Sequence, residues 1–191
     1  MPIINPQQPF VRPASIDGDV IVKIAEGPDD PRASDTGRVL MKLFAERTDG
    51  TRMLKRSDFS PTDLKAGLTN IMITDVKYDE NGLPVDAIIR LMGSALTIFY
   101  GEFTGKSVLD HPTESGERYM MDVRMAVETG CMIIGRAERA TPDETFLKVI
   151  SLVVPIADDG VHVNQTLALI QPYRRRNQPR GDSPDRALTV A

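Results

Sequence analysis

The segment at residues 90–109, RLMGSALTIFYGEFTGKSVL, constrains the fold of this chain more than any other. An apolar strand ends at Gly93, and a short apolar helix follows over residues 94–100. A turn at residues 103–106 then opens a second helical turn. The helix at 94–100 is too short to be a major element of the fold. The segment therefore predicts a strand that leads into a group of small helices.

Two strands are expected before these helices. Residues 70–76 form an apolar run, and Asn81-Gly82 lies between it and the next apolar run, which is a strong signal for a hairpin. In the second strand, alternate residues are apolar and are expected to face the core. These residues are Val85, Ala87, Ile89 and Leu91.

A longer helix and three strands are expected after the small helices. Residues 116–129 carry Tyr119, Met120, Val123, Ala126 and Val127 along one side of a helix, and Gly130 is a natural C-cap. The predicted strands span residues 131–139, 145–154 and 161–170, with turn residues at 141–143 and 158–160. The chain order is thus two strands, a helical middle and three strands.

This chain order, with the Thr104-Gly105 turn, resembles a PAS domain, the small curved-sheet sensor module of bacterial signalling proteins. It resembles most closely one bacterial PAS family that is met mainly as stand-alone short proteins of alphaproteobacterial type. The resemblance covers residues 39–170. It includes Arg56, Asp58 and Pro61, which stand where that family has an Arg-x-Asp-x-x-Pro-like turn.

The chain differs from this family on its first helix, where the family tends to carry an aromatic pair, often with Trp. Here the pair is Leu43-Phe44, and the chain has no Trp. The resemblance implies an α+β fold: a PAS-like, five-stranded, curved antiparallel sheet with helices on one face and an N-terminal amphipathic helix.

Three regions follow from this interpretation. Residues 1–33 are an N-terminal arm, rich in proline over its first half, with an expected edge strand at residues 20–24. Residues 34–170 form the PAS-like domain, whose first helix is capped by Ser34 or Asp35. Residues 171–191 form a flexible basic tail.

The first helix places four apolar residues on one face, which must pack against the sheet or against another subunit. We expect this face to form the interface of a homodimer. Its residues are Val39, Leu40, Leu43 and Phe44.

Composition favours a cytoplasmic protein. Its single cysteine, Cys131, forms no internal disulfide, and no segment resembles a signal peptide. No run approaches the roughly 18 apolar residues of a membrane span. The sequence therefore predicts no membrane span.

Charge is unevenly distributed along the chain. The tail at 171–191 has five arginines and two aspartates, a net charge of +3, so residues 1–170 carry −7 of the total of −4. Since an acidic body is a poor surface for nucleic acid, we expect no nucleic-acid partner. The tail arginines are expected to be solvated, with contact to an acidic partner or a membrane surface as the alternative.

The chain shows no predicted catalytic residue and no metal site. His111 is interpreted as a loop or capping histidine, with haem ligation as the alternative, and His162 is expected to face solvent. Cys131 lacks the Asn-Cys-Arg-Phe context of flavin-binding photosensor domains. No pair of histidines or cysteines has ligand spacing. We therefore expect no cofactor, with haem and flavin both disfavoured.

An apolar interior remains as the candidate binding site for a small ligand. The same residues would equally make a filled core, because protein interiors are close-packed. The residues expected around the ligand are Ile89, Leu91, Leu96, Phe99, Tyr100, Phe103, Tyr119, Val123, Met125 and Val149.

Two functions are consistent with these residues. The first is a non-catalytic sensory or regulatory protein of PAS type that acts through contacts with another signalling protein. The second is a small α+β enzyme with a buried carboxylate such as Glu102, Asp110 or Glu128 as general base. A carboxyl pKa strongly raised in a cavity would favour the enzyme. The sequence contains no paired acid and base, so we expect no enzyme activity.

Overall fold

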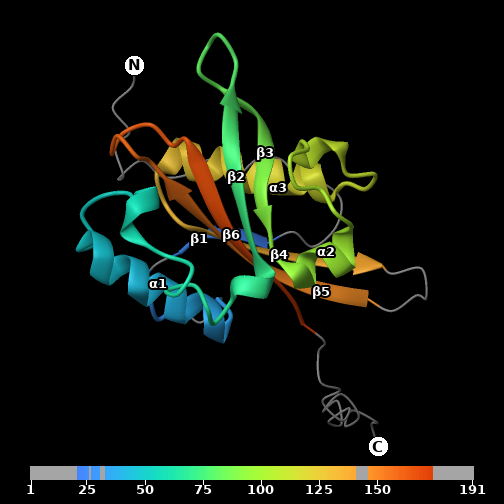
Figure 1. Ribbon diagram of the computed structural model, residues 1–191, viewed down its shortest axis with the longest axis horizontal. Coiled ribbons are helices and arrows are strands. Elements are labelled where there is room, and N and C mark those ends of the chain that lie inside the picture. Colours follow the sequence, from blue (N-terminus) through green and yellow to red (C-terminus); the bar gives the residue numbers. More distant parts are fainter. Residues whose placement is uncertain (1–20, 26, 31–32, 141–145, 174–191) are drawn as a thin grey trace, which may run out of the picture.

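The structure is a computed structural model that describes residues 21–25, 27–30, 33–140 and 146–173 of the 191 (Figure 1). The predicted arm up to residue 20, the turn at 141–143 and nearly all of the tail lie outside the described residues. The strands are β1 (Ile21–Ile24), β2 (Ile71–Tyr78), β3 (Pro84–Met92), β4 (Ile133–Ala140), β5 (Phe146–Ile156) and β6 (Gln165–Tyr173). The helices are α1 (Asp35–Thr48), α2 (Ser94–Tyr100) and α3 (Ser115–Thr129), with 3-10 turns η1 (Arg56–Asp58), η2 (Leu68–Asn70) and η3 (Val108–Asp110).

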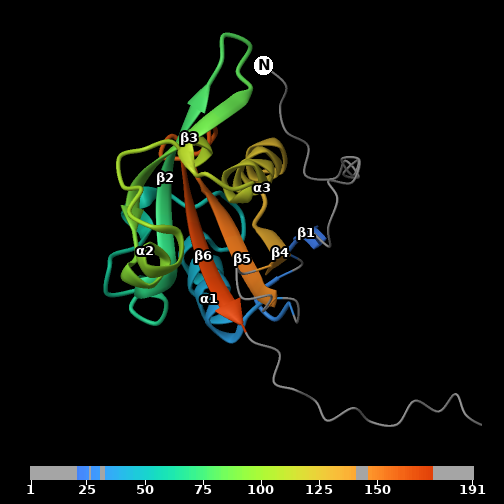
Figure 2. The same ribbon diagram turned by 90° about the vertical axis from the view of Figure 1, so that its right-hand side faces the viewer.

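One antiparallel sheet organises the chain. The strand order is β1-β4-β5-β6-β2-β3, so the first pair, β2 and β3, joins the last three strands through β6. The five-stranded antiparallel sheet expected from the sequence is confirmed, and β1 adds the expected edge strand beside β4. The hairpin of β2 and β3 extends beyond the rest of the sheet (Figures 1 and 2).

Both faces of the sheet are buried because side chains alternate along its central strands. In β2, Ile71 and Ile73 enter one apolar cluster while Met72 and Val76 enter the other. β5 and β6 divide their side chains between the same two clusters. The sheet therefore needs a cover on each side.

The first face is covered by α1. Ser34 caps this helix as expected, its Oγ accepting a hydrogen bond from Gly37 N at 3.0 Å. Leu40, Met41 and Phe44 are fully or almost fully buried against the sheet. The Phe44 ring also meets Phe59 with centroids 5.9 Å apart, which closes this core at one end.

The segment after α1 contains Arg56, Asp58 and Pro61, the residues of the predicted Arg-x-Asp-x-x-Pro-like turn. Asp58 accepts a hydrogen bond from Lys55 N at 2.7 Å and pairs with Arg52 at 2.6 Å. The Arg56 guanidinium lies 4.8 Å from the centre of the Phe59 ring. This turn therefore holds Phe59 over the end of the α1 core.

The second face is covered by α2, η3 and α3. The expected helix boundaries are nearly those observed, and Gly130 ends α3 in the left-handed conformation at φ 64°. The last strand begins four residues later than expected. The Asp159 side chain accepts hydrogen bonds from Val161 N and His162 N, and these hold the preceding residues in a turn.

Of the four residues expected at a subunit interface, some are buried within their own subunit and some are exposed. Leu40 and Phe44 are buried in the core of their own subunit, so they are not available to a partner, and Leu43 is partly buried against the same core. Val39 is 58% exposed. The expectation that all four residues contact a partner subunit was wrong, because the same apolar stripe of α1 is needed to cover the sheet.

None of the helices in the described ranges is long and apolar enough to cross a membrane.

Replacing Leu40 with Ala should lower the free energy of unfolding by about 3 kcal/mol, because a fully buried side chain leaves a cavity. Val39→Ala on the same helix should change it by less than about 0.5 kcal/mol. Urea unfolding of both variants measures this. Equal effects would contradict the packing of α1 described above.

Candidate functional site

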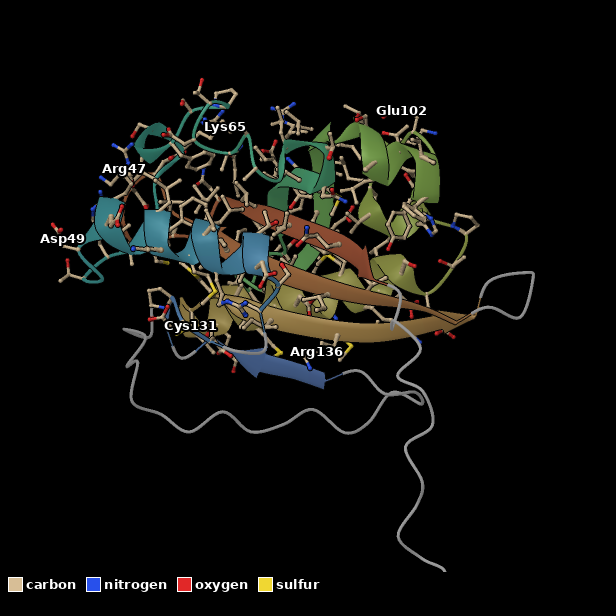
Figure 3. The ribbon with its side chains drawn as sticks, turned by 90° about the horizontal axis from the view of Figure 1, so that it is seen from below. Arg47, Asp49, Lys65, Glu102, Cys131 and Arg136 are labelled. Atoms are coloured by element: carbon tan, nitrogen blue, oxygen red, sulfur yellow. The ribbon has the colours of Figure 1, made fainter. Side chains whose placement is uncertain are left out.

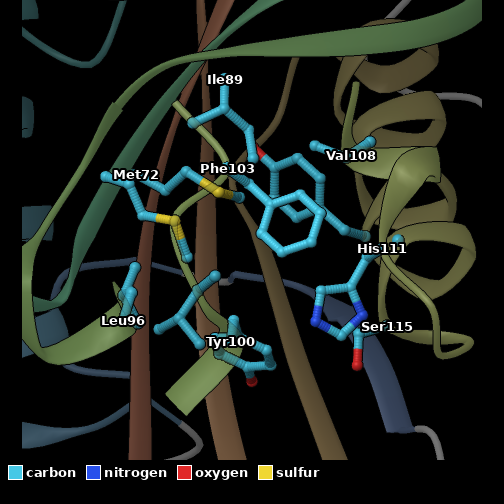
Figure 4. Close-up of a pocket in the computed structure, with 12 residues that line it drawn as sticks. Met72, Ile89, Leu96, Tyr100, Phe103, Val108, His111 and Ser115 are labelled. Atoms are coloured by element: carbon cyan, nitrogen blue, oxygen red, sulfur yellow. The ribbon is translucent and has the colours of Figure 1, made fainter. Parts of the chain in front are cut away.

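An apolar cavity lies between the sheet and the helices of its second face (Figure 4). It has a volume of about 80 Å³ and is partly open to solvent. β2, β3, α2, η3, α3 and β6 all contribute to its wall. The lining residues are Met72, Ile89, Met92, Leu96, Tyr100, Phe103, Val108, His111, Ser115, Gly116, Tyr119 and Ile170.

A close contact between two backbones forms one wall. At Gly116, a Cβ atom would lie 2.0 Å from the carbonyl oxygen of Val108, so no other residue fits there without a shift of the chain. This approach places the beginning of α3 directly against η3. The helix thereby presents Ser115 and Tyr119 to the cavity.

A β-bulge in β3 decides which of its residues face the cavity. Ile73 pairs with Leu91 and Thr74 with Ile89, so Arg90 is an extra residue in the strand. The extra residue reverses the alternation beyond it. Met92 consequently lines the cavity, whereas Leu91 is 40% exposed.

The cavity contains half of the residues that the sequence indicated. Ile89, Leu96, Tyr100, Phe103 and Tyr119 line it. Val123 and Met125 are buried in the same apolar cluster without lining it. Val149 lines a neighbouring cavity. The expectation that Val85, Leu91 and Phe99 face inward was wrong. Val85 and Leu91 flank the two register shifts of β3, and Phe99 lies on the outer side of α2.

His111 is a member of the wall that was not expected there. Its ring meets Tyr100 and Phe103 with centroids 5.7 and 5.1 Å apart. Its Nδ1 lies 2.9 Å from Thr113 Oγ1, within the loop before α3. The ring thus combines a capping contact in the loop with an aromatic contact at the cavity (Figure 4).

A second cavity of about 90 Å³ adjoins the first. The two share Tyr100, Ser115, Tyr119 and Ile170. The second is distinctly more polar, because its wall also contains Arg118, Asp122, Arg136 and Ser151, together with Gly135, Ala137 and Val149.

Asp122 is the buried carboxylate of this second cavity. It is 7% exposed, and its Oδ2 accepts a hydrogen bond from Ser151 Oγ at 3.2 Å. Burial raises the pKa of Asp122 to about 7, an effect that the Ser151 hydrogen bond only partly offsets. At Gly135 a Cβ atom would lie 2.8 Å from Asp122 Oδ2, so this glycine leaves room for the carboxylate.

The sequence analysis selected other carboxylates. Glu102, Asp110 and Glu128 are all exposed, and Figure 3 shows Glu102 at the edge of the molecule. Asp122 had a signal that was overlooked: it lies three residues after Tyr119 and four before Ala126, within the apolar stripe of α3. An acidic residue in such a stripe indicates a buried charge.

Three hydroxyl groups connect α3 to the sheet beside the cavities. Tyr119 OH and Thr166 Oγ1 are 2.7 Å apart, Thr74 Oγ1 and Thr166 Oγ1 are also 2.7 Å apart, and Thr74 Oγ1 lies 3.3 Å from Tyr119 OH. Burial raises the pKa of Tyr119 to about 12, despite these hydrogen bonds. The phenol therefore stays protonated and fixes the position of its ring.

Metal and thiol chemistry have little support at this site. The part of the chain that the structure describes contains no group of three or more His, Cys, Asp or Glu side chains placed to hold a metal ion. Cys131 follows the end of α3, donates to Thr129 O at 3.4 Å and lines neither cavity. A ligand in the cavities would not contact this thiol.

No model of a known protein family matches the chain, and no curated protein matches it. Among solved structures, it is similar to a PAS domain from Colwellia psychrerythraea, with 18% identity, 60% of this chain and 98% of that chain covered, and a TM-score of 0.36. It is similar to the light-oxygen-voltage domain of the blue-light photoreceptor Aureochrome1, with 16% identity, 58% and 86% covered and a TM-score of 0.40. An RNA-binding light-oxygen-voltage receptor shows 13% identity, 81% and 38% covered and a TM-score of 0.47, so the chain spans less than half of that receptor.

Replacing Asp122 with Asn should change how stability depends on pH. The carboxyl pKa is raised from about 3.8 to about 7 by folding, so the wild type loses stability as pH rises between these values. Because the Asn side chain carries no charge, the variant does not lose stability in this pH range through residue 122. Between pH 5 and pH 8, urea unfolding should show the variant gaining about 2 kcal/mol over the wild type.

Glu128→Gln is the matched control, since it removes an exposed carboxylate from the same helix. It should leave the pH dependence unchanged. A parallel pH dependence in Asp122→Asn and wild type would contradict the burial of the Asp122 carboxylate.

Proposed function

We propose that this chain is a non-catalytic sensory or regulatory protein of PAS type. It binds a small ligand in the apolar cavity and acts, as a homodimer, on another signalling protein. The observation that carries the proposal is the cavity itself, enclosed between the helical middle and the sheet of an α+β domain.

The composition of the cavity wall supports binding of a small molecule. Ligand pockets are mostly apolar with a few polar groups that orient the ligand. Here the polar groups are His111, Ser115 and Tyr119 among apolar neighbours. The cavity is partly open to solvent, and a ligand that fills it would bury its own apolar surface against the wall.

Helix α2 offers a route from the cavity to a partner protein. Leu96 and Tyr100 line the cavity on its inner side. Ile98 and Phe99 are 84% and 48% exposed on its outer side. Because this helix has only seven residues, a ligand that displaces the inner residues also moves the outer ones. The exposed apolar pair would then contact the partner differently with and without ligand.

Asp122 supplies one observation in favour of an enzyme, a carboxyl pKa of about 7 in a cavity. Acid and base roles are usually assigned to a pair of titratable groups whose pKa values are pushed apart. No histidine and no second carboxylate is among the described residues that line the second cavity. The regulatory function is therefore better supported than the enzyme.

Addition of 2-methylbutane should shift the NMR signals of the Met72 and Met92 methyl groups, because both side chains line the apolar cavity. The Met41 methyl group lies in the core beneath α1 and should not shift, which provides an internal control. Native mass spectrometry of freshly purified protein would show whether a cellular ligand is already bound. Unchanged Met72 and Met92 signals, with no bound ligand, would contradict the proposal.

Replacing Val39 with Asp should convert the dimer into folded monomers, because Val39 is the exposed member of the predicted interface on α1. Sedimentation velocity measures the change. Val161→Asp is the control, since Val161 is 64% exposed in the turn before β6, outside α1. A dimer that persists in Val39→Asp would exclude α1 from the interface.

A further inference from the structure

Three charged side chains, Arg118, Asp122 and Arg136, line the second cavity, and Arg118 and Asp122 form no ion pair with each other. Asp122 takes part in none of the ion pairs found within the described ranges, and its only hydrogen bond is the one from Ser151. Arg118 Nε is buried without a hydrogen-bond partner. Both residues belong to α3 and are four positions apart, so their side chains lie on one side of the helix. One acceptor and one donor of opposite charge thus border the same space.

We propose that the two cavities together form a binding site for a small α-amino acid with an apolar side chain. Its ammonium group binds Asp122, its carboxylate binds Arg118, and its side chain occupies the apolar cavity. The inference rests on the proposed function, because it names the ligand class of the same site.

The Asp122 carboxylate selects a ligand that donates hydrogen bonds. A buried carboxylate with one hydrogen bond leaves most of its acceptor capacity unused, and burial without compensation is costly. An ammonium group supplies three N–H donors and the opposite charge. Gly135 keeps the approach to Asp122 Oδ2 clear of a side chain. A neutral apolar ligand would leave this cost in place.

The Arg118 guanidinium selects an anionic group on the same ligand. One of its terminal nitrogens bonds Glu114 Oε2 at 3.1 Å, and this ion pair holds the side chain over the first turn of α3. Its Nε is buried without a hydrogen-bond partner, and the residue lines the second cavity. In an α-amino acid the two charged groups share one carbon atom. They can therefore reach two residues whose Cβ atoms are about 6 Å apart.

The size of the cavities limits the ligand's side chain. An apolar cavity of about 150 Å³ is known to hold benzene. The apolar cavity has about 80 Å³, and the polar one about 90 Å³. A branched aliphatic side chain such as that of leucine suits the first better than an aromatic ring does, and the charged backbone groups suit the second.

A matched series of four compounds tests this inference by isothermal titration at pH 8. L-leucine carries both charged groups, 3-methylbutylamine lacks the carboxylate, 4-methylpentanoate lacks the amine, and 2-methylbutane lacks both. We expect L-leucine to bind the wild type at least tenfold more tightly than each of the other three, since each of them lacks at least one charged group that forms hydrogen bonds in the proposed site.

Two variants assign the contacts. Asp122→Asn should remove the advantage of L-leucine over 4-methylpentanoate and leave the affinity for 4-methylpentanoate unchanged. Arg118→Gln should remove the advantage of L-leucine over 3-methylbutylamine. Glu128→Gln, on an exposed part of the same helix, should change neither. Urea unfolding confirms that each variant is folded.

The outcomes separate this inference from the proposed function. Equal affinities for L-leucine and 2-methylbutane, or a leucine advantage that survives Asp122→Asn, would overturn the amino-acid site and leave the apolar binding site intact. Tighter binding of 4-methylpentanoate than of L-leucine would also overturn it. Absence of binding by all four compounds would contradict the inference and the proposed function together.

Discussion

The sheet can exist only if both of its faces are covered, and the rest of the fold depends on this constraint. Neighbouring residues such as Leu152 and Val153 in β5, or Leu167 and Ala168 in β6, enter opposite cores and are almost completely buried. Helix α1 therefore cannot be an accessory that serves only a partner subunit. Its stripe completes one core, and the helical middle completes the other.

Features governed by local chemistry were predictable from the sequence. Ser34 caps the beginning of α1 with its side chain, and Gly130 ends α3 in the left-handed conformation. Both signals lie within a few residues of the helix end that they determine. The sequence did not allow the prediction that Met92, rather than Leu91, faces the cavity. It depends on how β3 pairs with β2, and an extra residue at Arg90 leaves no mark in the periodicity.

The candidate site likewise has an apolar part that was predictable from the sequence and a polar part that was missed. Apolar residues such as Leu96 and Phe103 were found because a PAS-like order places the small helices over the sheet. The polar half was missed because the position of Asp122 within the apolar stripe of α3 was overlooked. That position indicates a buried carboxylate, but its neighbours Ser151 and Gly135 face it only when α3 lies against β4 and β5.

The two cores of the protein differ in how completely they are packed. The α1 core is closed by large apolar side chains, with Phe44 against Phe59, and resembles the interior of any stable domain. The other core keeps two cavities and a buried carboxylate, although a leucine in place of Asp122 would remove the cost of burying a charge. Proteins that depart from good packing at one place commonly do so at functional sites. Since large apolar side chains fill the α1 core, that core can offset the stability that the second core loses to its cavities and its buried carboxylate.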